Sequence, residues 1–394
     1  MKSRRSAAAV TVAALLASAA HTTVQAADLD FDPDSGLTWT IGDGKNAPSL
    51  KLDGRFHGDY AEYSDDVTPL EDGFLLRRLR PALTFEWGDW KAKADYEFND
   101  RSQGVHTAYV EYDGFKRTVI RAGAQPMSFG LEASGSSNTN PFMERSLASS
   151  ALAPGSMAGL SLRKWDKRWN FTVGAYGNDI NDDEQRGLDG YGLVGRATGV
   201  PYKSDAMRMH VGVSLEFREA DSNAELRYRT RPESNVDGTR LVDTGAIAGV
   251  NRLGTEAVEL AWQYRSLLLS GEFLQSQAEM DRGGSLAFNG WQMTASWFPT
   301  GERRKYSEAF GAFGGVNPKH KWGAIELKAR ASDVDLVAGV VNGGKEHNEA
   351  FGVNWWYSEN IRVLSEYVLI HTDPGANGIA EDPSVVQVRV QIAF

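Results

Sequence analysis

The last ten residues of the chain, 385–394, alternate strictly between apolar and polar side chains and end on an aromatic residue. The apolar positions are Val386, Val388, Val390, Ile392 and Phe394. Gln387, Arg389 and Gln391 lie among the alternate positions. Because successive side chains of a strand point to opposite faces, this segment predicts a strand with one oily face and one wet face. A soluble β-sandwich could contain the same strand, so the rest of the chain has to decide.

The same alternation recurs along the whole chain. In residues 90–98, an apolar face that includes Trp90, Tyr96 and Phe98 alternates with a face carrying Lys91, Lys93, Asp95 and Glu97. Four charges on one face of one strand require water on that side. We count about sixteen such strands, and the connections alternate between tight turns and long polar loops. This pattern predicts an all-β fold, a transmembrane antiparallel β-barrel. The connection at 299–321 breaks it, because it is long and falls on the side of the short turns.

The first 26 residues read as a signal peptide. A basic start with Lys2, Arg4 and Arg5 precedes an alanine-rich apolar run, and small residues precede a cut ahead of Ala27. We therefore expect residues 27–394 to form the barrel in the bacterial outer membrane. The chain contains no cysteine, which excludes disulfides and thiolate metal sites. Its formal net charge is -10, so any chemistry that attracts anions has to be local.

Two groups of arginines are candidates for the lining of a pore. Arg227, Arg229 and Arg231 repeat at a spacing of two, with Arg240 downstream. In an extended segment this spacing places three guanidinium groups on one face, about 7 Å apart. Arginine remains charged and suits phosphate and carboxylate groups, so anions could step along the row. The alternative is a solvated face that nearby glutamates neutralise.

The second group lies in the predicted strand 73–88. Alternation places Arg78 and Arg80 on the wet face, and it places Arg77 on the opposite face. Residues 126–155 form a long polar segment in which Ser136 and Ser137 offer neutral hydrogen-bonding groups. If this loop folds inward it narrows the pore, whereas the alternative is an ordinary surface loop.

Several segments together resemble the phosphate-selective porin O and P family. They are residues 73–78, 129–137 with 142–146, 227–233 with 242–245, and 352–357. The resemblance implies a sixteen-stranded, homotrimeric outer-membrane channel for phosphate or polyphosphate, with an arginine ladder that leads to an infolded third loop. By position, Arg227, Arg229 and Arg231 match the ladder, Arg78 matches the wall arginine, and Ser136 and Ser137 match the loop serines. One departure is Gln125, where the family places a lysine.

Other functions have little support in the sequence. The histidines are scattered without metal-ligand spacing, and no nucleophile motif or phosphate-binding glycine loop is present, so we expect no enzyme, metal or cofactor. The acidic balance argues against nucleic acid as a partner. We expect passive diffusion of inorganic anions through a barrel embedded in outer-membrane lipid. A general porin for another anionic solute and a plugged adhesion or binding barrel remain alternatives.

Overall fold

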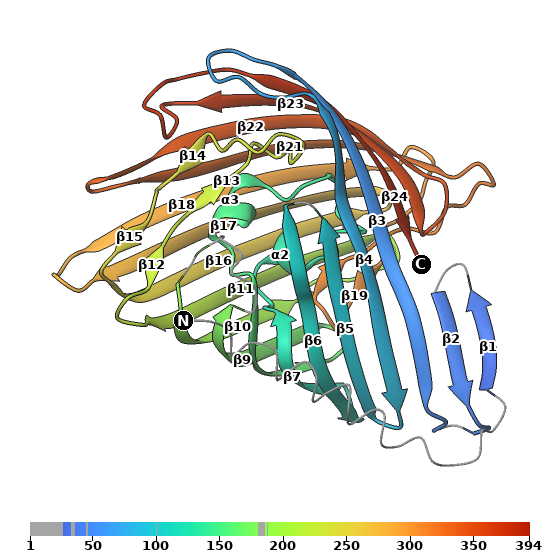
Figure 1. Ribbon diagram of the computed structural model, residues 1–394. Helices are drawn as coiled ribbons and strands as arrows, with labels where there is room; N and C mark the ends of the chain where they lie inside the picture. Colours follow the sequence, from blue (N-terminus) through green and yellow to red (C-terminus); the bar gives the residue numbers. More distant parts are fainter. Residues whose placement is uncertain (1–26, 33–35, 45, 100, 180–185, 187) are drawn as a thin grey trace.

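The computed structural model describes residues 27–32, 36–44, 46–99, 101–179, 186 and 188–394, so the predicted signal peptide lies outside the described residues. Sixteen antiparallel strands in this described part close a barrel (Figure 1), which confirms the predicted fold. The wall strands are β3 (Ser49–Ser64), β4 (Gly73–Trp87), β5 (Trp90–Asn99), β6 (Ser102–Phe115), β7 (Thr118–Pro126), β8 (Ser156–Trp165), β9 (Trp169–Asp179), β10 (Gly190–Gly199), β11 (Met207–Ala220), β16 (Val250–Tyr264), β17 (Leu267–Met280), β18 (Ser285–Trp297), β21 (Ala324–Ala338), β22 (Val341–Trp356), β23 (Ile361–Thr372) and β24 (Ser384–Ala393).

The terminal strand β24 closes the barrel against β3. Its pairing runs from Ser384 opposite Ser64 to Ala393 opposite Arg55. Arg389 of β24 lies directly opposite Asp59 of β3, and its guanidinium donates to both oxygens of that carboxylate at 2.6 and 2.7 Å. Closure leaves the wall without an unpaired edge, which is what a sheet in lipid requires.

Alternation separates the two faces of the wall. In β11, Val211, Val213 and Leu215 are exposed on the outer face, whereas His210 and Glu216 are buried inside. We call the end of the barrel with the short turns the turn side and the other end the loop side. Exposed aromatic side chains surround the turn side, as expected for a belt at a membrane interface. They are Trp87, Trp90, Phe115, Trp169, Tyr202, Tyr264, Trp297, Trp322, Trp355, Tyr357 and Phe394.

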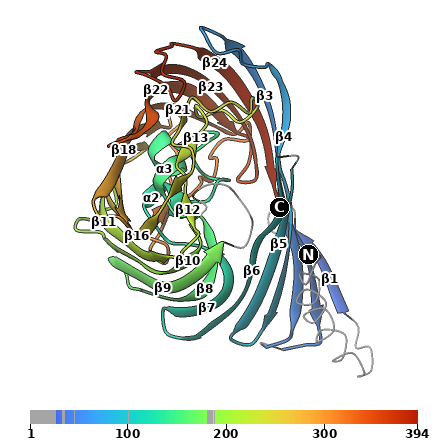
Figure 2. The same cartoon turned by 60° about the vertical axis from the view of Figure 1, so that its left-hand side comes forward.

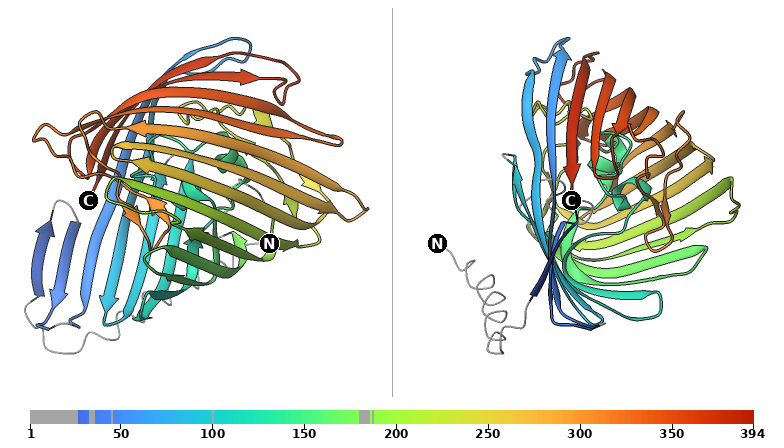
Figure 3. Two further views of the ribbon diagram at one scale, coloured as in Figure 1. Left: turned by 180° about the vertical axis from the view of Figure 1, so that it is seen from behind. Right: turned by 90° about the vertical axis from the view of Figure 1, so that its right-hand side faces the viewer.

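Three connections fold into the barrel (Figures 2 and 3). Loop L3, residues 127–155, carries the helices α2 (Leu131–Ser134) and α3 (Leu147–Leu152). Loop L5, residues 221–249, contains β12 (Glu225–Leu226), β13 (Arg229–Thr230), β14 (Val242–Asp243) and β15 (Ile247–Ala248). The third connection, residues 298–323, is called here the turn-side loop and contains β19 (Tyr306–Ser307) and β20 (Ala312–Phe313). This loop explains the irregularity at 299–321, because it turns inward where a short turn was expected.

A hydrophobic core inside the barrel joins L3 and L5 to one part of the wall. Leu147 and Leu152 of α3 and Tyr228 of L5 pack in one cluster with Phe288 of β18 and Val334 of β21, and all five side chains are fully buried. Burying one leucine side chain contributes roughly 1.5–3 kcal/mol. This packing fills the interior of the barrel beside β16 to β21.

The residues before β3, which include several aspartates, form a hairpin. β1 (Ala27–Asp32) pairs with β2 (Gly36–Ile41), and β2 pairs with the first residues of β3 (Figure 1). Trp39 lies opposite Leu50 in this pairing. Among the residues described, no α-helix has both the length and the apolar character needed to cross a bilayer.

Candidate channel and its arginine lining

A cavity of about 1120 Å³ runs through the barrel, and we call it the lumen cavity. Its lining extends from Arg101 and Gly238 on the loop side to Lys305 and Phe310 in the turn-side loop. The described wall residues that line it belong to β3 to β9. L3, L5, the turn-side loop and the connection between β5 and β6, which holds Arg101, supply the rest. The cavity is therefore displaced toward β3 to β9, away from the hydrophobic core.

Arginine dominates the charged residues of this lining. The lining arginines are Arg55, Arg77, Arg78, Arg80, Arg101, Arg121, Arg145, Arg163, Arg229, Arg231 and Arg240, and Lys93 and Lys305 add two ammonium groups. The carboxylates in the described lining are Asp95, Glu97, Glu144 and Glu233. An acidic protein thus carries a basic cavity. Low-dielectric walls focus this excess positive charge on the solute path.

A β-bulge places two consecutive arginines on the lumen side of β4. His57 of β3 pairs with Arg78 and Gly58 pairs with Leu76, so Arg77 is the extra residue. Alternation alone put Arg77 on the outer face, and this prediction is wrong, because a bulge inserts one residue and shifts the facing of the residues beyond it. Arg77, Arg78 and Arg80 all line the lumen cavity.

These arginines differ in their partners. Arg80 donates from Nη2 to Glu97 at 2.6 Å, and Arg77 donates from Nε and Nη2 to Glu144, both at 2.8 Å. Within the described residues, no carboxylate forms an ion pair with Arg78. A charged group that is enclosed without a counter-charge is costly, so Arg78 favours an anion from solution.

The predicted L5 row is only partly in the lining. Arg229, Arg231 and Arg240 line the lumen cavity, whereas Arg227 is outside the described lining and forms an ion pair with Asp243 at 2.6 Å. The row is therefore not one continuous face, since β13 ends within it. Burial, with repulsion from Arg240 and other arginines, lowers the pKa of Arg231 to about 10, so this side chain remains charged at neutral pH.

Ser136 and Ser137 of L3 both line the lumen cavity. The hydroxyl of Ser137 accepts a hydrogen bond from Arg55 Nη1 of the opposite wall at 3.2 Å. The Ser136 hydroxyl accepts from the backbone N–H of Asn138, also at 3.2 Å. These contacts put neutral hydroxyl groups beside the wall arginines, where they can supplement the charged groups in replacing the water shell of an ion.

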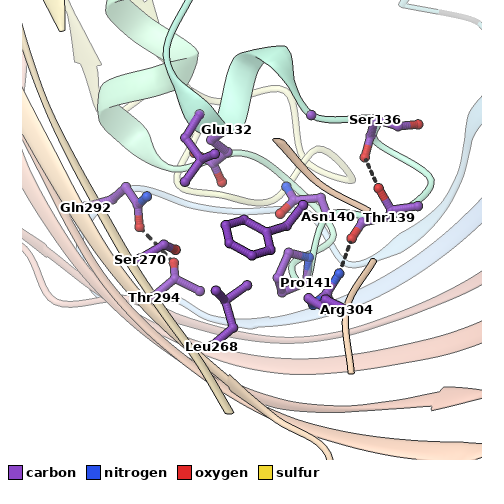
Figure 4. Close-up of a pocket in the computed structure, with 13 residues that line it drawn as sticks. Glu132, Ser136, Thr139, Asn140, Pro141, Leu268, Ser270, Gln292, Thr294 and Arg304 are labelled. Carbon is purple, nitrogen blue, oxygen red and sulfur yellow. Dashed lines mark hydrogen bonds between the residues drawn. The ribbon is translucent and has the colours of Figure 1, made fainter. Parts of the chain in front are cut away.

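The backbone of L3 between its helices is held by side chains of the turn-side loop and of the wall. Arg304 donates to the carbonyl of Thr139 at 2.7 Å (Figure 4), Arg362 donates to that of Asn140 at 2.8 Å, and Lys328 donates to that of Pro141 at 2.9 Å. These carbonyls have no partners in a helix or sheet, so the three cations satisfy them. A second cavity of about 60 Å³ lies beside this segment (Figure 4). L3 is therefore fixed in place inside the barrel.

The cations that hold L3 are also paired with carboxylates. Arg304 pairs with Glu326, and Lys328 pairs with Glu366 at 2.6 Å. Arg389 donates to the carbonyl of Met143 as well as to Asp59. Some inward-facing cations thus fix L3 in place and others face the lumen cavity. Arg55 and Arg77 do both.

Several lining residues were not among the predicted site residues. Arg55 and Arg121 lie on wet faces of alternating strands, so alternation could have found them. Arg101 is in a tight connection and Arg145 is in L3, where no periodicity assigns a direction. Gln125, the departure from the family pattern, also lines the lumen cavity, and its side-chain carbonyl accepts from Ser161 at 2.7 Å.

Comparison with known proteins agrees with this architecture. Porin O of Pseudomonas aeruginosa is 24% identical over 383 residues, covering 85% of each chain. An anion-selective porin from Comamonas acidovorans has a TM-score of 0.55 at 15% identity, covering 88% of this chain and 100% of that one. The outer-membrane channel DcaP of Acinetobacter baumannii has a TM-score of 0.54 at 12% identity, covering 90% and 99%.

Another similar structure is OmpT, an outer-membrane protein of Vibrio cholerae in its trimer form, with a TM-score of 0.55 at 10% identity, covering 88% of this chain and 99% of that one. The low identities mean that these structures show a shared fold. The protein is located in the bacterial outer membrane. The family model of phosphate-selective porin O and P matches residues 50–394, so the chain belongs to that family of porins.

Proposed function

We propose that this porin lets anions diffuse passively across the outer membrane through the lumen cavity. The excess of arginine and lysine over carboxylate in the lining carries the proposal. Arg78 and Arg80 would attract the anion at the wall, Ser136 and Ser137 would replace part of its water shell, and Arg229, Arg231 and Arg240 would receive it from the loop side. Several neighbouring binding sites make entry of an ion favourable, and none of them binds it so tightly that it cannot leave.

Phosphate or polyphosphate is the solute class that we propose first. The family description and the planar fork of arginine, which binds phosphate through two hydrogen bonds, both favour it. A specific observation favours a second candidate, a porin for other anionic solutes. Gln125 is neutral and already hydrogen-bonded to Ser161, so the lining lacks the cation that the family pattern places there.

Reversal potentials test the proposal directly. The purified porin is reconstituted in planar bilayers under a salt gradient, first in potassium chloride and then in potassium phosphate. We expect preference for the anion in both salts, and a preference for cations would overturn the proposal. Arg78→Ala should reduce the preference, whereas Arg252→Ala, on the outer surface, should leave it unchanged. Equal permeabilities of phosphate and chloride would favour the second candidate.

We also propose a homotrimer, supported by the trimer form of the structurally similar OmpT. Chemical cross-linking in native outer membranes, followed by electrophoresis of the unheated protein, should give a band of three chains. A single-chain band under conditions that cross-link a known trimer would contradict this.

A further inference from the structure

Two arginines at the turn side of the lumen cavity have their guanidinium groups over aromatic rings. The guanidinium carbon of Arg163 in β8 is 4.2 Å from the ring centre of Phe310 in the turn-side loop. That of Arg121 in β7 is 4.1 Å from the ring centre of Tyr109. All four side chains line the cavity. Val119, which lies opposite Arg163, also belongs to the lining, so apolar surface accompanies the two charges here.

The two arginines differ in their charge balance. Arg121 donates from Nε and Nη2 to one oxygen of Glu111, at 2.9 and 2.6 Å. Within the described residues, the side chain of Arg163 has no carboxylate partner, and its Nε is enclosed without a hydrogen-bond partner. Stacking covers the face of a guanidinium and leaves its N–H edges available to a carboxylate. Within the described residues, Arg163 therefore presents a positive charge that has no ion-pair partner and is held beside the ring of Phe310.

Phe310 lines the lumen cavity and is nevertheless an exposed aromatic residue. It keeps 47% of its surface accessible although Arg163 lies over its ring. Apolar surface in water is unfavourable, by about 25 cal/mol for each Å², and an apolar solute that covers it recovers that free energy. A small inorganic anion could use the N–H edges of Arg163 but would leave the ring wet.

We propose that Arg163 and Phe310 form a binding subsite for organic carboxylates with a flat apolar body. The carboxylate would bind the edge of the Arg163 guanidinium, and the apolar body would cover the accessible surface of Phe310. The subsite lies at the turn-side exit of the solute path. This inference rests on the proposed anion conduction and extends it from inorganic anions to aromatic acids.

Block of chloride current by benzoate tests the subsite. Benzoate, acetate or inorganic phosphate is added on the turn side of the full-length porin in a planar bilayer, and the concentration that halves the chloride conductance is measured. We expect benzoate to block at a concentration about tenfold lower than acetate does. Arg163→Gln should raise the half-blocking concentration of benzoate about tenfold, or about 1.4 kcal/mol. Phe310→Leu should weaken the block by benzoate and leave any block by acetate or phosphate unchanged.

Two variants on the same side of the barrel serve as controls. Arg168→Gln removes an exposed arginine in the turn after β8, and Phe115→Leu removes an exposed aromatic residue of the outer belt. Neither should alter the block. Equal potency of benzoate and acetate, or full benzoate block in Phe310→Leu, would overturn the subsite. Reversal potentials recorded on the same membranes separate this outcome from failure of anion conduction, which would appear as cation preference.

Discussion

The carboxylate of Glu233 in L5 accepts a hydrogen bond from the backbone N–H of Leu147, the first residue of α3 in L3, at 3.2 Å. The same carboxylate accepts from Arg330 and Ser332 of the wall strand β21, and its residue has a φ of 54°. For a residue other than glycine, this left-handed backbone conformation raises the free energy of the folded state by roughly 1–2 kcal/mol. The contacts of Glu233 must therefore exceed that cost. They join L5, which carries Arg231, to L3 and to the wall.

Glu233→Gln should loosen both loops without opening the barrel. Removing one partner of a buried ion pair costs about 3–5 kcal/mol, because Arg330 then lacks part of its counter-charge. We expect noisier open-channel current and faster proteolysis within L5, and the anion preference should rise rather than fall, because the variant removes one carboxylate of the lining. Glu225→Gln, at an exposed position of the same loop, is the matched control. If the open-channel current of Glu233→Gln is no noisier than that of the wild type, L5 is held by its hydrophobic contacts instead.

The arginines of L5 should contribute unequally to selectivity. One unit charge about 7 Å away in water changes the energy of an ion by about 0.6 kcal/mol, or a factor of two to three. Replacing both Arg229 and Arg231 with alanine should therefore lower the anion-to-cation permeability ratio about fivefold or more. Arg227→Ala should change it less than twofold, because Asp243 neutralises that side chain outside the described lining. Reversal potentials in a chloride gradient measure both effects, and equal losses would contradict this division.

Much of the fold could be predicted because the strands of a barrel in lipid alternate between apolar side chains that face outward and polar side chains that face inward. The lining was less predictable, for three physical reasons. A bulge turned Arg77 inward, the irregular backbone of L5 separated Arg227 from Arg229, and the turn-side loop brought Phe310 onto Arg163. Each of these features depends on contacts between segments that are distant in the sequence, and the local alternation of residues cannot predict such contacts. Arg55, in contrast, lies on a regular strand and was accessible to the same reasoning.

Gln125→Lys should increase the preference of the porin for phosphate over chloride. Gln125 lines the lumen cavity on β7 and is neutral, so a lysine there adds a cation beside the base of L3. We expect the phosphate-to-chloride permeability ratio to rise about two- to threefold, the change expected from one unit charge about 7 Å from the solute in water. Gln277→Lys adds the same charge on an exposed part of β17 and should have no effect. An unchanged ratio in Gln125→Lys would mean that the cation is not what sets phosphate preference in this pore.

Glu144 should remain ionised well into the acidic range. Burial alone would raise its pKa, but Arg77 and Arg389 lower the pKa of this L3 carboxyl well below its usual value. A lowered pKa means that the ion pairs contribute fully above the unfolded value, about 4.3, and are lost only as the pH falls through the folded value. Between pH 7 and pH 4, Glu144 should therefore keep its charge.

The charge of Glu144 can be detected by comparing the ion selectivity of the wild type with that of Glu144→Gln. The variant lacks one negative charge in the lining, so its anion-to-cation permeability ratio should exceed that of the wild type about two- to threefold at pH 7. Because Glu144 stays ionised in the wild type, the gap between the two proteins should be the same at pH 4. Reversal potentials at both pH values measure the gap, and other titrating groups affect both proteins alike. A gap that closes by pH 4 would mean that Glu144 titrates normally and that its contacts with Arg77 and Arg389 are weak in the membrane.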